Sequence, residues 1–196
     1  MKKYLLVNTI TAISLILGLI AIYFAVHGYL YFSFGFALLA FVTDSLDGFL
    51  ARKLGAESRF GAIFDTLTDI IVYLMYPAII LFNEFGMSNI VGLSSIGLFL
   101  LAGVFRLVRF TNNGFEVEGE KKYYLGMPVF FSHFIVMIMM VVNMLDKQLL
   151  QIVGPLILVT MSLMMVTKLR FRKPTSIFLG IFICMILTIS IFMFCI

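Results

Sequence analysis

Apolar residues run along this chain in seven long segments separated by short polar connections. The segments cover residues 4–26, 29–51, 60–82, 89–110, 127–145, 149–167 and 175–195. Each is long enough to cross the hydrocarbon core of a bilayer as a helix, which takes roughly 20 residues. Connections as short as His27–Gly28 and Asp146–Gln148 indicate helical hairpins. The pattern predicts an all-α polytopic membrane protein that forms a single domain over residues 1–196.

The composition agrees with this prediction. Of the 196 residues, 62% are apolar and 12% are charged, whereas soluble domains average about 45–50% and about 25%. This balance excludes an ordinary soluble domain. The polar stretch around residues 116–122 mixes acidic and basic residues and predicts a solvated loop; it gives no signal for nucleic-acid binding.

The basic residues predict the orientation in the membrane. With the N-terminus inside, the cytoplasmic side receives thirteen of the fourteen, and Lys147 alone lies outside. The thirteen are Lys2, Lys3, Arg52, Lys53, Arg59, Arg106, Arg109, Lys121, Lys122, Lys168, Arg170, Arg172 and Lys173. The seventh segment then places the C-terminus outside.

Carboxylates stand among apolar residues at the facing ends of the second and third segments: Asp44, Asp47, Asp65 and Asp69. Asp44 and Asp47 are three residues apart, and Asp65 and Asp69 are four apart, so each pair shares one face of a helix. Between the pairs, Gly55 and Gly61 favour a helix end, a turn and a new helix start. Two antiparallel helices meeting there would direct all four carboxylates to one point.

Four converging carboxylates repel one another and require a cation to stay ionised. Oxygen ligands with no nearby Cys or His favour Mg²⁺ or Mn²⁺ over Ca²⁺ and exclude zinc. The alternative is a structural, ion-paired helix junction. Only Arg52 follows the carboxylates closely in register, and a charge at mid-helix costs roughly 2.5–3.5 kcal/mol, so a metal-using function is the better hypothesis.

Small and polar residues flank these carboxylates. Gly48, Ala51 and Gly61 allow a ligand or a neighbouring helix to approach the backbone closely. Arg52 is a fixed positive group suited to a phosphate. Ser58 either caps the third helix or donates a hydrogen bond to a ligand.

The pattern Asp44-x2-Asp47-Gly48-x2-Ala51-Arg52-x8-Gly61-x3-Asp65-x3-Asp69 resembles the signature of the CDP-alcohol phosphatidyltransferases, with every fixed position filled. The resemblance implies a six-helix membrane core, to which the last apolar segment adds a seventh helix. It also implies transfer of a phosphatidyl-type group from a CDP-linked lipid to an alcohol, with release of CMP. Members of this family are expected to form homodimers.

The resemblance further implies a role for each matching residue. Asp44, Asp47 and Asp65 would hold a pair of Mg²⁺ or Mn²⁺ ions, and Asp69 would be a shared ligand or the general base. The cytidine and pyrophosphate site would be lined by Gly48, Ala51 and Arg52, with Gly61 opposite and Ser58 nearby. Asn8 and Thr11 resemble an Asn-x2-Thr element that contacts the nucleotide, although polarity at a helix end explains them equally well.

The acceptor alcohol has to be inferred from other residues. Arg106 and Arg109 share a face near the cytoplasmic end of the fourth segment. They either follow from the positive-inside rule or form an anion site for a carboxylate or phosphate. The string from Arg106 to Asn112, with Tyr124-Leu-Gly-Met-Pro128, resembles elements of bacterial and archaeal phosphatidylserine synthases. Thr111 shifts the asparagine by one position from that pattern, and bulky residues follow Pro128 where small ones are expected.

The hypothesis is therefore an integral protein of a prokaryotic cell membrane that converts CDP-diacylglycerol and L-serine to phosphatidylserine and CMP at the cytoplasmic face. Arg106 or Arg109 would pair with the serine carboxylate. One alternative keeps the chemistry with another polar alcohol, such as glycerol 3-phosphate or inositol phosphate. Another is a cation transporter, although a transporter would be expected to place its carboxylates near the membrane midplane.

Overall fold

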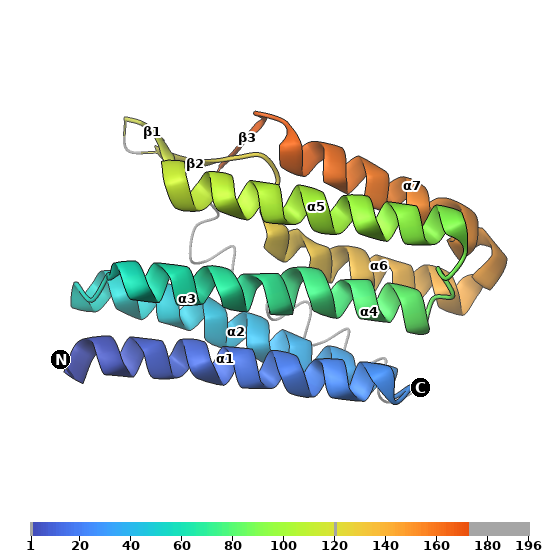
Figure 1. The fold of residues 1–196 in the computed structure, drawn as a ribbon, viewed down its shortest axis with the longest axis horizontal. Coiled ribbons are helices and arrows are strands. Elements are labelled where there is room, and N and C mark those ends of the chain that lie inside the picture. Colours follow the sequence, from blue (N-terminus) through green and yellow to red (C-terminus); the bar gives the residue numbers. More distant parts are fainter. Residues whose placement is uncertain (1, 120, 173–196) are drawn as a thin grey trace. The chain divides into compact units, whose positions relative to one another are not determined.

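The computed structural model describes residues 2–119 and 121–172 of the chain (Figure 1). Helices make up most of this part. In chain order the elements are α1 (Lys2–Val26), α2 (Leu30–Leu54), α3 (Arg59–Asp69), a π-helical segment (Ile70–Met75), α4 (Tyr76–Asn83), α5 (Ile90–Asn113), β1 (Glu116–Glu118), β2 (Lys121–Leu125), a 3₁₀ turn (Val129–Phe131), α6 (Ser132–Leu145), α7 (Lys147–Val166) and β3 (Arg170–Arg172).

The prediction of an all-α membrane protein is confirmed. In the described part, five helices are long and apolar enough to cross a bilayer: Lys2–Val26, Leu30–Leu54, Arg59–Asn83, Ile90–Asn113 and Lys147–Val166. The third of these runs continuously through α3, the π-helical segment and α4. A sixth apolar helix, Val129–Leu145, is shorter. The predicted seventh helix, at residues 175–195, lies outside the described residues.

Two compact units make up the described chain, the first ending at Val72 and the second beginning at Tyr73. The predicted single domain stays a prediction. In the first unit, α1 packs along α2 and also contacts α3 (Figure 1). In the second, α5 packs along α7, α6 packs against α7, and α4 contacts α5 and α6.

Small residues and two hydroxyls join α1 to α2. The Ser14 hydroxyl donates to the Ala40 carbonyl, and the Ser33 hydroxyl donates to the Ala21 carbonyl, both at 2.8 Å. Ala21 and Ala40 are fully buried. Helices in lipid associate through close packing of small residues and interhelical hydrogen bonds, so these contacts fix α1 against α2.

The predicted hairpin connections are present and short. Gly28 adopts a positive φ of 77° between α1 and α2, a conformation that glycine reaches without strain. Asp146 alone joins α6 to α7, and its carboxylate accepts hydrogen bonds from the backbone N–H groups of Gln148 and Leu149 at 2.7 and 3.3 Å. The connection predicted at residues 146–148 is therefore a single capping residue.

A small antiparallel sheet replaces part of the predicted solvated loop. Strand β2 lies between β1 and β3, with Val117 opposite Lys122 and Tyr124 opposite Phe171. On its surface, the Arg170 guanidinium forms ion pairs with the glutamates of β1, at 2.9 Å from Glu116 and 3.2 Å from Glu118. The sheet thus ties the segment that follows α5 to the segment that follows α7.

Candidate functional site

The chain reverses direction sharply between α2 and α3. Helix α2 ends at Leu54 and is capped by Gly55, which adopts a left-handed conformation with φ 59° and donates its N–H to the last turn of the helix. Helix α3 begins at Arg59 and is capped by Ser58, whose hydroxyl oxygen accepts a hydrogen bond from the Gly61 N–H at 3.0 Å. These two caps bring Asp65 of α3 back beside the aspartates of α2. Ser58 thus makes the capping contact, which is one of the two roles predicted for it.

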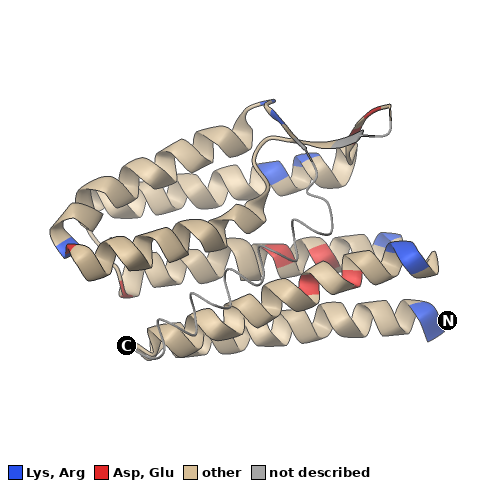
Figure 2. Ribbon diagram, turned by 180° about the vertical axis from the view of Figure 1, so that it is seen from behind, with Lys and Arg blue, Asp and Glu red and all other residues tan. Residues whose placement is uncertain are grey.

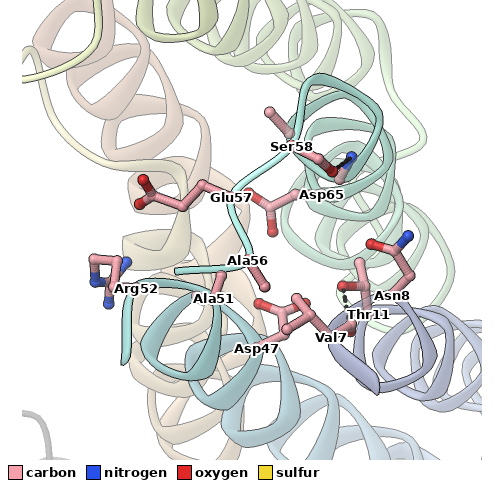
Figure 3. Close-up of a pocket in the computed structure, with 13 residues that line it drawn as sticks. Val7, Asn8, Thr11, Asp47, Ala51, Arg52, Ala56, Glu57, Ser58 and Asp65 are labelled. Carbon is pink, nitrogen blue, oxygen red and sulfur yellow. Dashed lines mark hydrogen bonds between the residues drawn. The ribbon is translucent and has the colours of Figure 1, made fainter. Parts of the chain in front are cut away.

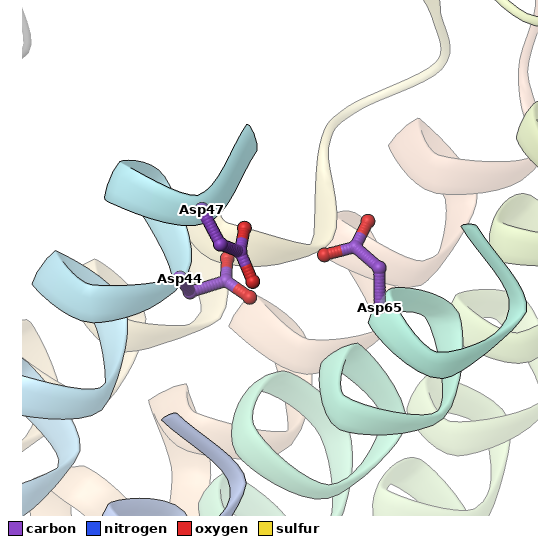
Figure 4. A group of neighbouring side chains, drawn as sticks. All are labelled: Asp44, Asp47 and Asp65. Atoms are coloured by element: carbon purple, nitrogen blue, oxygen red, sulfur yellow. The ribbon is translucent and has the colours of Figure 1, made fainter. Parts of the chain in front are cut away.

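Three of the predicted carboxylates come together (Figure 4). Asp44, Asp47 and Asp65 each present an oxygen, and these oxygens lie within 4.8 Å of one another. Figure 2 shows the acidic residues of α2 and α3 as neighbouring coloured patches on the two helices. Asp69 follows Asp65 by one helical turn, at the end of α3, and does not belong to this group of three.

Asp47 is the most enclosed member of the group. Only 3% of its surface is exposed, and its Oδ2 atom has no hydrogen-bond partner among the described residues. A buried charged oxygen without a hydrogen-bond donor is unfavourable unless a ligand or a cation compensates its charge. The atoms available to ligate a metal here are carboxylate oxygens alone, which are the ligands that hard divalent cations prefer. The three side chains therefore fit Mg²⁺ or Mn²⁺.

A cavity of about 250 Å³ opens beside these carboxylates (Figure 3). Asp47 and Asp65 line it from α2 and α3, and residues of α1 close it on a third side. All the residues predicted for the nucleotide and pyrophosphate lie on its wall: Asn8, Thr11, Gly48, Ala51, Arg52, Ser58 and Gly61. The structure thus brings together, around one space in the first unit, residues that lie up to 57 positions apart in the chain.

Two glycines, Gly48 and Gly61, place no side chain in the wall of this cavity. A Cβ atom on Gly61 would lie 3.0 Å from the Ser58 hydroxyl oxygen and 3.3 Å from Asn8 Oδ1. A Cβ atom on Gly48 would lie 3.3 Å from Arg52 Nη1. Any larger residue would displace the polar groups that face the cavity. The predicted reason for small residues here, close approach of a ligand to the backbone, stays a prediction.

Four further residues line the cavity and were not predicted from the sequence: Val7, Ala56, Glu57 and Ala62. Val7 also accepts a hydrogen bond from the Thr11 hydroxyl, at 3.2 Å, through its carbonyl oxygen. Glu57 lies in the turn between α2 and α3 (Figure 3). Its place in the sequence, between the two pairs of aspartates, could have predicted that it lies at the cavity, because the turn joins the two helices that carry the carboxylates.

Arg106 and Arg109 belong to the second unit and have different surroundings. Arg106 is 4% exposed, and its guanidinium lies over two rings, 5.0 Å from the centre of Phe110 and 5.3 Å from that of Tyr124. The Arg109 guanidinium instead donates hydrogen bonds to backbone carbonyls at the end of α7 and to the carbonyl of Leu125. The two arginines thus share a helix face but not an environment.

Comparison with known proteins gives a consistent picture. The sequence profile of the CDP-alcohol phosphatidyltransferases matches residues 4–195. The chain is 31% identical over 174 residues to a CDP-diacylglycerol–serine O-phosphatidyltransferase of Methanocaldococcus jannaschii, covering 88% of this chain and 77% of that protein. It is 30% identical over 127 residues to the enzyme of that name from Helicobacter pylori, covering 64% of this chain and 53% of that protein.

A third relative is an archaetidylserine synthase of Methanothermobacter thermautotrophicus, 34% identical over 118 residues, which cover 57% of this chain and 47% of that protein. The chain therefore spans about half the length of the second and third relatives. The family match extends over nearly the whole chain and includes both the aspartate cluster and the cavity beside it. On these grounds the chain belongs to the CDP-alcohol phosphatidyltransferase family and is a phosphotransferase.

Proposed function

We propose that this protein transfers a phosphatidyl-type group from CDP-diacylglycerol to L-serine and releases CMP. The observation that carries the proposal is the convergence of Asp44, Asp47 and Asp65 beside a cavity lined by all the predicted nucleotide residues. The names of the relatives favour serine as the acceptor. Family membership favours this enzyme over the cation transporter considered from the sequence.

The donor would bind in the cavity of the first unit. Arg52 would contact the pyrophosphate, because a guanidinium offers several donors in a fixed geometry that suits phosphate oxygens. Asn8 and Thr11 of α1 would contact the nucleotide. Because Gly48 and Gly61 have no side chains, the nucleotide would be able to approach the helix backbone there.

The reaction would be a substitution at the lipid-side phosphorus. The serine hydroxyl oxygen forms a new bond to that phosphorus, the bond from phosphorus to the bridging oxygen breaks, and CMP leaves with that oxygen. A carboxylate accepts the hydroxyl proton, and Asp69 is our candidate for this general base or for a shared metal ligand. Divalent ions held by Asp44, Asp47 and Asp65 would neutralise the pyrophosphate and the charge that develops on CMP.

The acceptor's anionic group would be recognised by the arginines of α5. Arg106 is the stronger candidate because the Arg109 guanidinium already donates to backbone carbonyls, whereas the Arg106 guanidinium lies against two aromatic rings. A carboxylate and a phosphate would both suit such a group. Glycerol 3-phosphate and inositol phosphate are therefore tested as the alternative acceptors.

In the described part of the chain, five apolar helices of membrane-spanning length indicate an integral membrane enzyme, so that the phosphatidylserine product would stay in the bilayer while CMP leaves into water. We retain the predicted orientation, with the N-terminus and the active site at the cytoplasmic face of a prokaryotic membrane. We also retain the predicted homodimer. Cysteine labelling from each side of sealed vesicles would test the orientation.

The deciding experiment is CMP release by the purified protein supplied with CDP-diacylglycerol and Mg²⁺ or Mn²⁺. L-Serine, glycerol 3-phosphate and inositol phosphate are offered separately, and an ether-linked CDP-lipid is run in parallel. We expect release with serine that stops when EDTA is added and resumes when Mg²⁺ or Mn²⁺ is restored in excess. Release only with another alcohol would overturn the choice of acceptor, and no release from a folded sample would overturn the proposal.

A further inference from the structure

A single side chain of α5 connects two distant segments of the second unit. Arg109 Nη1 donates to the Val166 carbonyl at 2.8 Å. Its Nη2 atom lies 2.7 Å from the carbonyl oxygen of Leu125, 2.9 Å from that of Met165 and 3.3 Å from that of Thr167. The guanidinium therefore joins the last turn of α7 to the end of β2.

The carbonyls that Arg109 contacts need donors. The last carbonyls of a helix have no partner within the helix, and a basic side chain near that end both donates to them and complements the helix dipole. Helix α7 ends at Val166. A planar guanidinium can serve several carbonyls at once, whereas the ammonium of a lysine is a point charge on a flexible stem.

Gly126 makes this arrangement possible. Its φ of 76° is left-handed, and a Cβ atom there would overlap Arg109 Nη2 and the Met165 carbonyl. Its N–H donates to the Leu169 carbonyl at 2.8 Å, and the N–H of Met127 donates to the Met164 carbonyl at 3.0 Å. Only glycine meets both requirements, the backbone angle and the open space.

The end of β2 also carries a ring that contacts Arg106. Tyr124 precedes Leu125, whose carbonyl Arg109 holds, and the ring of Tyr124 lies 5.3 Å from the Arg106 guanidinium. The ring of Phe110 lies 5.5 Å from that of Tyr124 and 5.0 Å from the same guanidinium. Fixing Leu125 therefore fixes one of the two rings against which Arg106 lies.

We propose that Arg109 and Gly126 form a clamp that holds β2 against the end of α7, and that Arg109 is a positioning residue for Arg106. The acceptor's anionic group is then recognised by Arg106, not by Arg109. From the sequence alone, the two arginines are equivalent candidates. This assignment of roles rests on the proposed function, whereas the clamp itself does not.

The clamp is tested by thermal unfolding of the full-length protein in detergent without substrates. We expect Arg109→Ala and Gly126→Ala each to lower Tm by about 5–10 °C, because several hydrogen bonds to a charged group are lost. The Tm of the double variant should be no lower than the Tm of the less stable single variant, because both changes remove the same contacts. Additive losses would overturn the clamp.

A conservative exchange gives a milder form of the same test. Arg109→Lys keeps the charge but loses the planar donor set, so we expect at least half of the Tm loss of the alanine variant. A wild-type Tm in Arg109→Lys would overturn the clamp. Arg59→Lys, an exposed arginine at the start of α3, is the matched control and should unfold as the wild type does. If an alanine variant does not fold, the cycle is run with Arg109→Lys.

The positioning role is tested with L-serine and with L-serinamide, which lacks the carboxylate. The readout is the ratio of the two kcat/KM values for CMP release. We expect Arg106→Ala to reduce the preference for serine about tenfold or more. Arg109→Lys and Gly126→Ala should reduce it less, and neither should reduce it further when Arg106 is already alanine.

A further loss of preference in the Arg106→Ala background would show that Arg109 binds the carboxylate itself, and would overturn the proposal. An unchanged preference in both Arg109→Lys and Gly126→Ala would also overturn the positioning role. If the wild type releases CMP only with glycerol 3-phosphate, the kcat/KM comparison is made between glycerol 3-phosphate and glycerol, which lacks the phosphate. If it releases none, the proposed function and the role of Arg106 fail together, while the unfolding experiment still decides the clamp.

Discussion

The aspartates of the first unit and the arginines of the second are both charged groups on apolar helices, but the protein accommodates them differently. The Arg109 guanidinium is surrounded by backbone carbonyls that accept its hydrogen bonds. In contrast, Asp47 is buried more completely than Arg109, and although Thr11, the Gly48 N–H and Arg52 interact with its carboxylate, its Oδ2 atom has no hydrogen-bond partner among the described residues. A charge that the chain itself compensates contributes to the fold, whereas one that it compensates only in part favours binding of a ligand.

The energetic cost is similar in both regions. A charged side chain in a membrane-spanning helix costs roughly 2.5–3.5 kcal/mol on the insertion scale. At Arg109 the cost is offset by helix-end carbonyls that would otherwise lack donors. At Asp44, Asp47 and Asp65 it is increased by mutual repulsion over less than 4.8 Å. Binding of a divalent cation to the aspartates would offset both the cost of their burial and their mutual repulsion. This is why we assign the two regions different roles.

The largest effect should follow from removing a charge of the aspartate group. We expect Asp65→Asn and Asp47→Asn each to lower kcat for CMP release at least about 10²-fold, since a divalent ion contributes several kcal/mol to stabilising the transition state. Both variants should unfold at the wild-type Tm or above it, because a repulsive charge has been removed. The measurement pairs CMP release with thermal unfolding in the absence of added metal.

The matched control is Glu84→Gln, an acidic residue that follows α4, outside the group. It should retain wild-type activity. If Asp47→Asn instead lost stability along with activity, the carboxylate would be compensated within the protein, and the contrast with Arg109 would fail.

Local sequence patterns were sufficient to predict that Asp44, Asp47 and Asp65 come together. The spacing of Asp44, Asp47 and Asp65 along two helices, with Gly55 and Ser58 as the caps between them, is contained in a short stretch whose partners are near in sequence. The hairpin geometry then follows from helix periodicity. The resemblance to a family signature added the roles, which stay predictions, and the residues concerned line one cavity.

The environment of Arg109 could not be predicted in this way. Its partners are backbone carbonyls 16 and 56–58 residues away, and a carbonyl is present at every position whatever the residue. From the sequence, Arg109 and Arg106 differ only in their place in one short pattern. The small sheet was missed for a related reason, because its three strands are short and their pairing depends on where α5 and α7 end.

A smaller effect should follow from filling the space beside the aspartates. Gly61→Ala would bring a methyl group to 3.0 Å from the Ser58 hydroxyl oxygen and 3.3 Å from Asn8 Oδ1. Overpacking of this kind costs about 1–3 kcal/mol, so we expect KM for CDP-diacylglycerol to rise about tenfold while KM for serine changes little. The control is Gly97→Ala on α5, where an added Cβ meets nothing within 4 Å. Equal effects of the two changes would show that the cavity wall is not where the nucleotide binds.

The smallest effect should come from polar groups that the chain fully compensates. Ser14→Ala and Ser33→Ala each remove one interhelical hydrogen bond between α1 and α2, for which measured values in membrane helices average about 0.6 kcal/mol. We expect each to lower Tm by about 1–3 °C and to leave kcat unchanged. Ser94→Ala is the control, because its hydroxyl donates only within its own helix, to Ile90 at 2.6 Å. If Ser14→Ala lost activity without losing stability, the contrast with the aspartates would fail. A polar group whose hydrogen bond is satisfied within the chain would then affect the reaction as the aspartates do.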